Sequence, residues 1–387
     1  YFLYMNKKIL LFIVLSVLIN SALLAGWENK SFKLNGRNRD YRIYIPKDFS
    51  LSKKYSLIVG IHGLGDDMTN FSNSFTYLAK VADTANIILA YPQGLENPIL
   101  GRGWNAGAGM LGIYPSADVN DVAFINAVTD SMQFNFPVDK KRTYLFGFSN
   151  GGYMVYRMAC QANEKFAAMA SIAGTLGNQI TNCNPGRPIP ILHLHGTADL
   201  NVGYYINLFG INVDDLMKKW RNINGCAPTP VREDVPNTKQ DGYTVEHYIY
   251  QNCKKPLELF KVNNALHIFL YKDINDISYA EEIWRFFSRE SLDEDITTGI
   301  YNSLKKEDVK ILPNPAQDIL TIDVRALEIY NEFQLTIFDC VGNEILQLPR
   351  NNSGIYTFNC SELPNGIYLI NFGNDKQNFT TKFSIVH

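Results

Sequence analysis

The chain has 387 residues, of which 46% are hydrophobic and 19% charged. This composition is typical of a folded globular protein and excludes wholesale disorder, and the length favours two folded units over one. The formal net charge is −2, which excludes the strongly basic surface typical of nucleic-acid-binding proteins.

The N-terminus has the three parts of a secretory signal. Lys7 and Lys8 precede an apolar run at residues 9–19, and small residues follow it. A membrane anchor is the alternative, but a spanning helix needs about 20 apolar residues, more than this run provides. We expect a signal peptide over residues 1–25, with the residues ahead of Met5 being upstream sequence.

The next part of the chain has the pattern of a mixed α/β domain. Residues 31–45 alternate around a polar turn, which predicts two antiparallel strands. Apolar strands then alternate with helices, which indicates a mostly parallel sheet covered on both faces. The predicted strands are residues 56–62, 87–91, 143–148, 189–195, 247–251 and 257–262. The predicted helices are residues 77–84, 119–132, 152–161, 213–221 and 278–287.

The texture changes after residue 287. Residues 288–310 are rich in charged side chains and are predicted to be a linker. Short alternating strands without helices then predict a small β-sandwich over residues 311–387. These strands are residues 319–324, 333–338, 344–347, 355–358, 367–372 and 379–385. The α/β domain is accordingly assigned to residues 26–287.

A nucleophile motif lies at the junction of a predicted strand and a predicted helix. Residues 147–151 read GFSNG and fit G-x-S-x-G, the sharp turn that lifts a serine hydroxyl above the sheet. The small glycines allow the close backbone approach that this turn needs. A glycine-rich turn with an idle serine is the alternative. The strand–turn–helix setting favours Ser149 as the nucleophile.

The acid should follow a later strand, since this fold orders its triad as serine, acid and histidine. Asp199 fits, because it comes after the apolar strand at 189–195 and a glycine turn. A capping aspartate in a loop is the alternative. As the acid, Asp199 would hold the imidazole in its working tautomer and stabilise the imidazolium.

Three histidines follow the acid and could be the base. His387 is the terminal residue, and His247 lies within a predicted strand. His267 lies on a loop after the last predicted strand of the α/β domain, where it could reach the nucleophile. We therefore predict His267 as the base and keep His247 as the alternative. His193 and His195 are expected to be structural.

An oxyanion hole is predicted from residues 61–66, which read IHGLGD after an early strand. Hydrolases of this fold pair a backbone N–H from this loop with that of the residue after the nucleophile. The donors would be Leu64 and Asn150. A common glycine-rich turn is the alternative.

Of the six cysteines, four lie in the α/β domain and two in the C-terminal part, so each unit has an even number, and export would permit disulfides. Four cysteines in the α/β domain allow three connectivities. Local pairs close the shortest loops, so we favour Cys160–Cys183 and Cys226–Cys253. Whether Cys340 pairs with Cys360 stays open.

Taken together, these segments resemble the secreted polyhydroxybutyrate depolymerase/feruloyl esterase group of the α/β-hydrolases. The matching segments are IHGLGD at 61–66, YPQG at 91–94, GWNAG at 103–107, VNDVAFI at 119–125, GFSNGG at 147–152 and HGTAD at 195–199. The resemblance implies Ser149, Asp199 and His267 as the triad. Cys160 and Cys226 also match cysteines of the group.

Two departures and one tryptophan bear on the resemblance. The group usually has a Gly-Gly-His-x-Trp-Pro type segment around its histidine, whereas residues 264–269 read NALHIF. Its usual paired aspartate is Asn120-Asp121 here. Trp104 resembles a residue near the site, where it would contact an aromatic acyl group of the substrate. A tryptophan of the core is the alternative.

The C-terminal part resembles the sorting domain of type IX secretion. The segments that carry this resemblance are ILPNPA at 311–316, IFDCVG at 337–342 and LPNGIY at 363–368. It implies export by outer-membrane secretion machinery and a secreted or surface-attached protein. A carbohydrate-binding sandwich is the alternative.

The expected function is hydrolysis of a feruloyl or acetyl ester on plant polysaccharide by a monomer that needs no metal or organic cofactor. A polyhydroxyalkanoate polyester is the second substrate considered. A surface polysaccharide-binding protein with an inactive hydrolase fold is the alternative from another class.

Overall fold

The computed structural model describes residues 25–34, 36–109, 119–292, 309–325, 334–339, 344–349, 353–373 and 378–387. Nearly all of the predicted signal peptide and most of the predicted linker lie outside these residues. None of the helices within them is both long and apolar enough to span a membrane.

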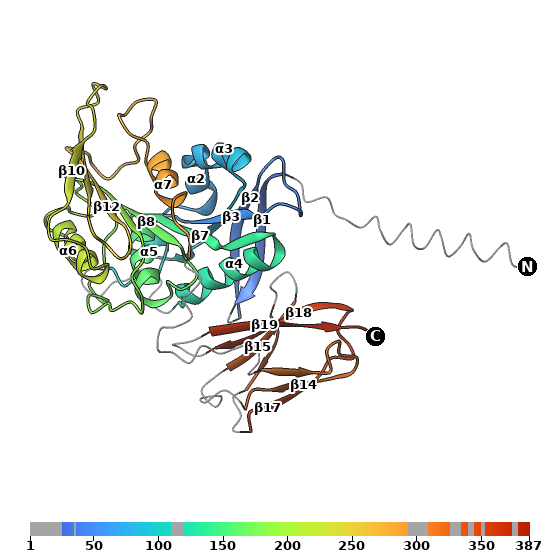
Figure 1. The fold of residues 1–387 in the computed structure, drawn as a ribbon. Coiled ribbons are helices and arrows are strands. Elements are labelled where there is room, and N and C mark those ends of the chain that lie inside the picture. Colours follow the sequence, from blue (N-terminus) through green and yellow to red (C-terminus); the bar gives the residue numbers. More distant parts are fainter. Residues whose placement is uncertain are drawn as a thin grey trace, which may run out of the picture.

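Ten strands of the described residues form one sheet. They are β1 (Gly26–Leu34), β2 (Arg37–Ile45), β3 (Tyr55–Ile61), β4 (Ile87–Pro92), β7 (Val138–Phe148), β8 (Ala168–Ile172), β9 (Ile191–Gly196), β10 (Val231–Asp234), β11 (Thr244–Ile249) and β12 (Leu257–Asn263). Their order is β1-β2-β4-β3-β7-β8-β9-β12-β11-β10 (Figure 1). The strands from β4 to β12 in this order are parallel, and antiparallel strands flank them on both sides. The predicted mostly parallel α/β fold is confirmed.

Helices cover both faces of this sheet (Figure 1). One face carries α4 (Asp121–Asn135), α5 (Asn150–Gln161) and α6 (Val213–Ile223), whose apolar side chains share one core. The other carries α2 (Met68–Ser74), α3 (Thr76–Ala85) and α7 (Tyr279–Phe287), which share a second core. A hairpin of β5 (Leu95–Asn97) and β6 (Gly101–Gly103) lies outside the sheet. The strands β8 and β10 and the helix α2 have no counterpart among the predicted elements.

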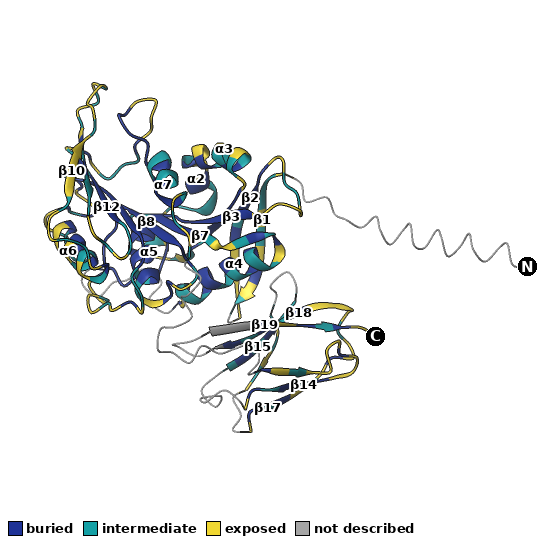
Figure 2. Ribbon diagram, viewed as in Figure 1, coloured by how far each residue is buried: buried dark blue, intermediate teal, exposed yellow. Residues whose placement is uncertain are grey.

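The two cores follow from the pleat of the strands. Leu57 and Val59 of β3 contribute to the core on the α5 side, whereas Ile58 between them contributes to the core on the α3 side. Leu145 and Phe146 of β7 divide in the same way, because successive side chains of a strand point to opposite faces. Figure 2 shows the buried strands between helices whose outer surfaces are exposed.

The chain keeps contact with this sheet beyond residue 287. The hydroxyl of Tyr144 donates to the carbonyl of Glu290 at 2.7 Å. The backbone N–H of Leu292 donates to the carbonyl of Lys141 at 2.9 Å. The first residues of the predicted linker therefore pack on the α/β domain.

The C-terminal part has two small antiparallel sheets in the described residues. One holds β13 (Lys310–Leu312), β14 (Ile319–Asp323) and β17 (Ile355–Asn359). The other holds β16 (Glu344–Leu348), β15 (Gln334–Phe338), β18 (Gly366–Gly373) and β19 (Asn378–Ile385). Side chains of both sheets, among them Ile322, Ile337 and Ile370, share one hydrophobic core. This arrangement is the β-sandwich that the alternating strands predict.

Two disulfides join the cysteine pairs favoured from their spacing. Cys160, in α5, is bonded to Cys183, and Cys226, just after α6, is bonded to Cys253. Cys360 is a buried free thiol, and Cys340 lies outside the described residues. Each bond ties a helix end to a loop.

Removal of either disulfide should destabilise the α/β domain by a similar amount. The bonded cysteines are 23 and 27 residues apart in the sequence, so the loop-entropy model assigns about 3 kcal/mol to each bond. We expect Cys160→Ala/Cys183→Ala and Cys226→Ala/Cys253→Ala each to lower the free energy of unfolding by roughly this amount. Urea denaturation of both double variants is the measurement. An unchanged free energy in either variant would contradict the assignment.

Candidate active site

Ser149 lies at the turn between β7 and α5 in a conformation that side chains rarely adopt. Its φ is 56° and its ψ is −119°. Ser149 precedes the first turn of α5, yet its hydroxyl makes no capping hydrogen bond to that helix. Its backbone N–H instead donates to the carbonyl of Ile172 at the end of β8, at 2.9 Å. The turn is thus held by the backbone, which leaves the hydroxyl for chemistry.

The glycines of the G-x-S-x-G motif are required by close packing. A Cβ on Gly147 would overlap the carbonyl oxygen of Gly151. A Cβ on Gly151 would overlap the carbonyl oxygen of Ile61 at the end of β3. The start of α5 therefore approaches the backbone of β3 and β7 more closely than any side chain would allow, as expected for a nucleophile elbow.

Asp199 and His267 meet at the carboxyl edge of the parallel strands. Asp199 follows β9 and His267 follows β12, and these two strands are parallel neighbours. The Nδ1 of His267 donates to Oδ2 of Asp199 at 2.7 Å. The carboxylate is buried, while the imidazole is partly exposed. The structure thus brings together two of the predicted residues, which are 68 positions apart in the chain.

Several donors surround the Asp199 carboxylate. Its Oδ1 accepts from the backbone N–H groups of Asn201 and Val202 at 2.9 and 2.8 Å. Burial alone would raise the pKa of Asp199, but hydrogen bonds from His195 and His267 outweigh burial and hold that pKa well below its usual range. Asp199 therefore stays ionised beside the imidazole of His267.

The imidazole of His267 lies next to the nucleophile turn. Its ring packs on the ring of Phe148, the residue before Ser149, with centroids 4.7 Å apart. Phe269 packs on the ring of Phe148 as well, with centroids 4.2 Å apart. Ser149 and His267 are each partly buried. The aromatic pair Phe148 and Phe269 therefore packs beside His267 next to the turn that carries the partly exposed Ser149.

The loop after β3 lies directly over Ser149. A Cβ placed on Gly63 would lie only 3.4 Å from the Cβ of Ser149, so the neighbouring Leu64 N–H is close to the turn. The Asn150 N–H begins α5, and the first N–H groups of a helix have no acceptor within the helix. The partial positive charge at the start of α5 adds to this donor. Both predicted oxyanion donors thus belong to backbone that surrounds Ser149.

His62 holds the oxyanion loop as a neutral side chain. Its Nδ1 donates to the carbonyl of Gly63 at 2.7 Å, and its Nε2 accepts from the N–H of Gly94 at 2.9 Å. Burial lowers the pKa of His62 to about 4, although the bond to Gly63 opposes this shift. Its role was not predicted, and its only sequence signal is its place in the IHGLGD segment.

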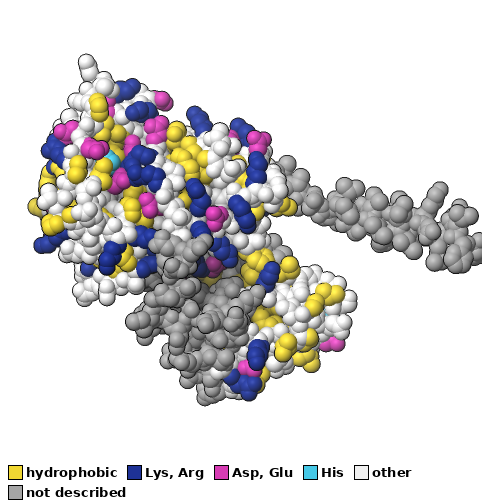
Figure 3. Space-filling model, in the orientation of Figure 1, with side chains coloured by type: hydrophobic (Ala, Val, Ile, Leu, Met, Phe, Trp, Pro, Cys, Tyr) yellow, Lys and Arg dark blue, Asp and Glu magenta, His cyan; other side chains and the backbone are white. Residues whose placement is uncertain are grey.

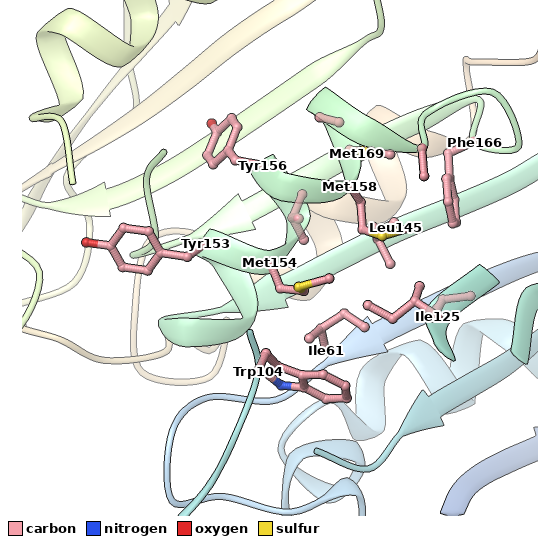
Figure 4. Close-up of a cluster of buried hydrophobic side chains, with 14 of the residues drawn as sticks. Ile61, Trp104, Ile125, Leu145, Tyr153, Met154, Tyr156, Met158, Phe166 and Met169 are labelled. Carbon is pink, nitrogen blue, oxygen red and sulfur yellow. The ribbon is translucent and has the colours of Figure 1, made fainter. Parts of the chain in front are cut away.

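Trp104 lies in the core, which favours the alternative of a core tryptophan over a contact with substrate. Its ring is fully buried and stacks near Phe124, and Figure 4 shows it with Ile61 and Met154 in the apolar cluster. The indole Nε1 donates to the carbonyl of His62 at 2.9 Å. The backbone N–H of Trp104 donates to Oδ1 of Asn150 at 2.7 Å. The residue fills the space under the oxyanion loop and connects that loop to α5.

A buried ion pair supports the segment that carries Trp104. The Nη2 of Arg39 in β2 donates to Oδ1 of Asp121 at 2.7 Å, and both side chains are buried. The other oxygen of Asp121 accepts from the N–H of Asn105 at 2.7 Å. Asp121 belongs to the VNDVAFI segment, but no local pattern predicts this pairing, because Arg39 lies 82 residues away.

The other candidate bases have different partners. The Nε2 of His247 bonds to Glu258 at 2.9 Å, and its ring stacks on Phe260 with centroids 4.0 Å apart. Burial would raise the pKa of Glu258, but hydrogen bonds from His247 and Arg285 lower it to about 2. The Nε2 of His387 bonds to the carbonyl of Leu363 in the C-terminal part. In the described residues, no cluster of three or more His, Cys, Asp or Glu side chains could hold a metal ion.

Comparison with known proteins gives the family. Residues 50–220 match the phospholipase/carboxylesterase family. The chain is 30% identical over 262 residues to feruloyl esterase C of Emericella nidulans, covering 66% of this chain and 85% of that enzyme. The chain belongs to the same carboxylesterase family as this enzyme. The resemblance stated from the motifs is thereby confirmed.

Two further likenesses involve acetylxylan esterases. The carboxylesterase is 27% identical over 267 residues to a bifunctional acetylxylan esterase/xylanase of Neocallimastix patriciarum, covering 68% of this chain and 35% of that protein. The chain spans less than half the length of several curated relatives that it matches. A solved acetyl xylan esterase from Aspergillus awamori superposes with a TM-score of 0.47 at 18% identity, covering 67% of this chain and 99% of that one.

The C-terminal part also has a family. Residues 310–386 match the secretion system C-terminal sorting domain. The predicted sorting domain is confirmed, and the protein is secreted or attached to the cell surface.

Replacement of Trp104 should affect stability and the rate of turnover but not substrate affinity. We expect Trp104→Phe to lower the free energy of unfolding by about 1–3 kcal/mol, because it leaves the His62 carbonyl without its donor. The kcat for a short p-nitrophenyl ester should fall, because the oxyanion loop loses its support, while KM stays within about twofold.

Trp220→Phe is the matched control for this substitution. Trp220 is also fully buried, and its Nε1 has no hydrogen-bond partner in the described part of the chain. This variant should lose stability and keep its kcat. A KM raised at least tenfold by Trp104→Phe alone would restore the role of Trp104 as a substrate contact.

Proposed function

We propose that the protein is a serine carboxylic ester hydrolase that removes feruloyl or acetyl groups from plant cell-wall polysaccharide. The observation that carries the proposal is the 2.7 Å hydrogen bond between His267 and Asp199 beside the strained turn at Ser149. This combination is that of a nucleophile, a base and an acid that orients the base.

In the proposed reaction, His267 takes the proton of the Ser149 hydroxyl as its oxygen attacks the ester carbonyl. The N–H groups of Leu64 and Asn150 bind the oxyanion of the tetrahedral intermediate. Asp199 stabilises the imidazolium, which then gives its proton to the departing alcohol and leaves an acyl group on Ser149. Water, deprotonated by His267, attacks the acyl group and releases the acid. The reaction needs no metal or organic cofactor.

Three exposed leucines favour an apolar acyl group. Leu64 is in the oxyanion loop, Leu200 follows the acid and Leu266 precedes the base, with exposed fractions of 42%, 89% and 51%. An aromatic feruloyl group could bury part of this apolar surface. The relatives named feruloyl esterase and acetylxylan esterase support an ester on a polysaccharide. A polyhydroxyalkanoate is the second substrate to be tested.

The surface and the C-terminal part suggest the partners. Acidic and basic side chains are interspersed on the face shown in Figure 3, which suits a neutral polysaccharide better than a nucleic acid. In this proposal, residues 1–25 are removed on export, and residues 311–387 are recognised by outer-membrane type IX secretion machinery. Residues 26–287 form the esterase domain, residues 288–310 link it to the sorting domain, and the mature enzyme is a monomer.

Substitution of the proposed triad should abolish turnover. We expect Ser149→Ala to lower kcat for a p-nitrophenyl ester by about 10⁴-fold or more, and His267→Ala by a comparable factor. A fluorophosphonate probe should label the wild type and not Ser149→Ala. His247→Ala is the control and should keep its activity. Inertness of the wild type to the probe together with binding of polysaccharide would favour a non-catalytic binding protein.

Leu200 provides a test of the acyl preference. Leu200→Asn keeps the branching of the side chain but makes it polar, and we expect it to raise KM for methyl ferulate about fivefold and to leave an acetyl ester unaffected, because about 1 kcal/mol of apolar contact is lost.

Leu51→Asn is the matched control, because Leu51 has an exposed fraction of 68% and precedes β3 at the opposite edge of the sheet. Release of ferulate from arabinoxylan, compared with clearing of a polyester suspension, identifies the polymer. Clearing of the polyester without release of ferulate would reject the polysaccharide substrate.

A further inference from the structure

Three fully buried polar side chains lie in a row that ends at the proposed acid. The hydroxyl of Tyr156 in α5 is 3.0 Å from Nδ1 of His193. The Nε2 of His193 is 3.1 Å from Nδ1 of His195, two residues further along β9. The Nε2 of His195 is 2.7 Å from the carbonyl of Val202 and 3.4 Å from Oδ2 of Asp199. The proposed reaction uses none of these three side chains.

The pleat of β9 creates this row. His193 and His195 alternate with Leu192 and Leu194, which contribute to the core on the α7 side. The two imidazoles therefore point to the opposite face of the sheet, toward α5, where Tyr156 meets them.

One set of proton positions satisfies every contact in the row. The Val202 carbonyl and the Asp199 carboxylate only accept, so Nε2 of His195 carries a proton and its Nδ1 accepts. His193 then donates from Nε2 and accepts at Nδ1 from the Tyr156 hydroxyl. Both imidazoles are neutral in this arrangement. Burial lowers the pKa of His193 well below its ordinary value, and a positive charge on the neighbouring His195 would lower it further. Burial raises the pKa of Tyr156 well above its ordinary value.

The hydrogen bonds of the row run from Tyr156 through His193 to His195, whose Nε2 bonds to the Val202 carbonyl and lies 3.4 Å from Oδ2 of Asp199. His195 contacts Oδ2 of the carboxylate and also holds the carbonyl of Val202, whose N–H donates to Oδ1. We propose that His195, itself oriented by His193 and Tyr156, is a positioning residue that holds the Asp199 carboxylate in the orientation His267 requires. This proposal rests on the proposed function, since it assigns a role only if Asp199 orients the base.

The free-energy cost of burying these polar side chains indicates that the row does more than fill space in the core. Two imidazoles and a phenol in the core lose their hydration, and this loss is offset only while each keeps its hydrogen bonds. Apolar side chains of similar size would fill the same space without that cost. The row therefore supplies orientation at its one contact with the chemistry, which is the Asp199 carboxylate.

Two isosteric replacements of His195 separate orientation from packing. The amide nitrogen of Gln can take the place of Nε2, whereas that of Asn ends near Nδ1 and cannot reach Val202 or Asp199. In the full-length protein, His195→Asn should lower kcat about ten- to a hundredfold, because the hydrogen bond to the Val202 carbonyl and the contact with the Asp199 carboxylate are both lost, with KM little changed. His195→Gln should stay within about threefold of the wild type.

The pH profile provides a second readout. Without the His195 donor, the Asp199 carboxylate attracts the imidazolium of His267 more strongly. The acid limb of kcat/KM should therefore move to higher pH in His195→Asn and not in His195→Gln. Tyr153 and Tyr279 also lie near Asp199, but burial raises the pKa of both phenols above the pH range of the acid limb.

Labelling of Ser149 by a fluorophosphonate distinguishes failure of the inference from failure of the proposed function. Equal rates and equal pH profiles for His195→Asn and His195→Gln, in a protein whose wild type is labelled, would overturn the inference alone. No labelling or hydrolysis by the wild type would overturn the proposed function. Tyr156→Phe removes only the terminal hydroxyl and serves if His195→Asn does not fold. It should lower kcat about threefold, and an unchanged kcat and pH profile would exclude Tyr156 from the row.

Discussion

The close backbone approach between the start of α5 and the ends of β3 and β7 is the constraint on which the site depends. Gly147 and Gly151 leave no room for a Cβ, and the chain between them reverses so sharply that Ser149 has a φ of 56°. The same approach sets the Asn150 N–H against the loop that carries Leu64. A larger side chain at either glycine would move α5 away from the sheet and separate the nucleophile from its oxyanion donors.

The charged acid of the site is buried, whereas the two other side chains of the proposed triad are partly exposed. Asp199 is buried and ionised, because hydrogen bonds from its own loop and from His267, with His195 in contact at 3.4 Å, replace the water that it loses. His267 and Ser149 are partly exposed. The buried carboxylate of Asp199 therefore contacts an imidazole that solvent and substrate can still reach. In the proposed reaction, this arrangement suits His267, which must take up and release a proton.

Much of the family motif supports the site without contacting substrate. His62 holds the oxyanion loop through Gly63 and Gly94, and Trp104 fills the core beneath it. The buried ion pair of Arg39 and Asp121 extends this support to β2 and α4. Such supporting residues occur in the same sequence motifs as the proposed catalytic residues, because both kinds must lie close to the site. The motif alone does not distinguish the two kinds.

The sequence by itself determined the class of fold, the predicted nucleophile and a short list of candidate bases. These follow from local patterns: apolar runs of strand length, a glycine–serine–glycine turn, and the chain order of serine, acid and histidine. The sequence of β8, AMASI, has too weak a strand preference for this strand to be predicted. Its pairing with β7 on one side and β9 on the other defines it.

Only the tertiary structure decided that His267 and not His247 meets Asp199, that Trp104 is buried, and that Tyr156, His193 and His195 form one row. Apart from the contact between His193 and His195 within β9, these contacts join residues that are far apart in the chain or on different elements. They depend on the order of the strands and on which face each side chain points to, and no local pattern of residues specifies either.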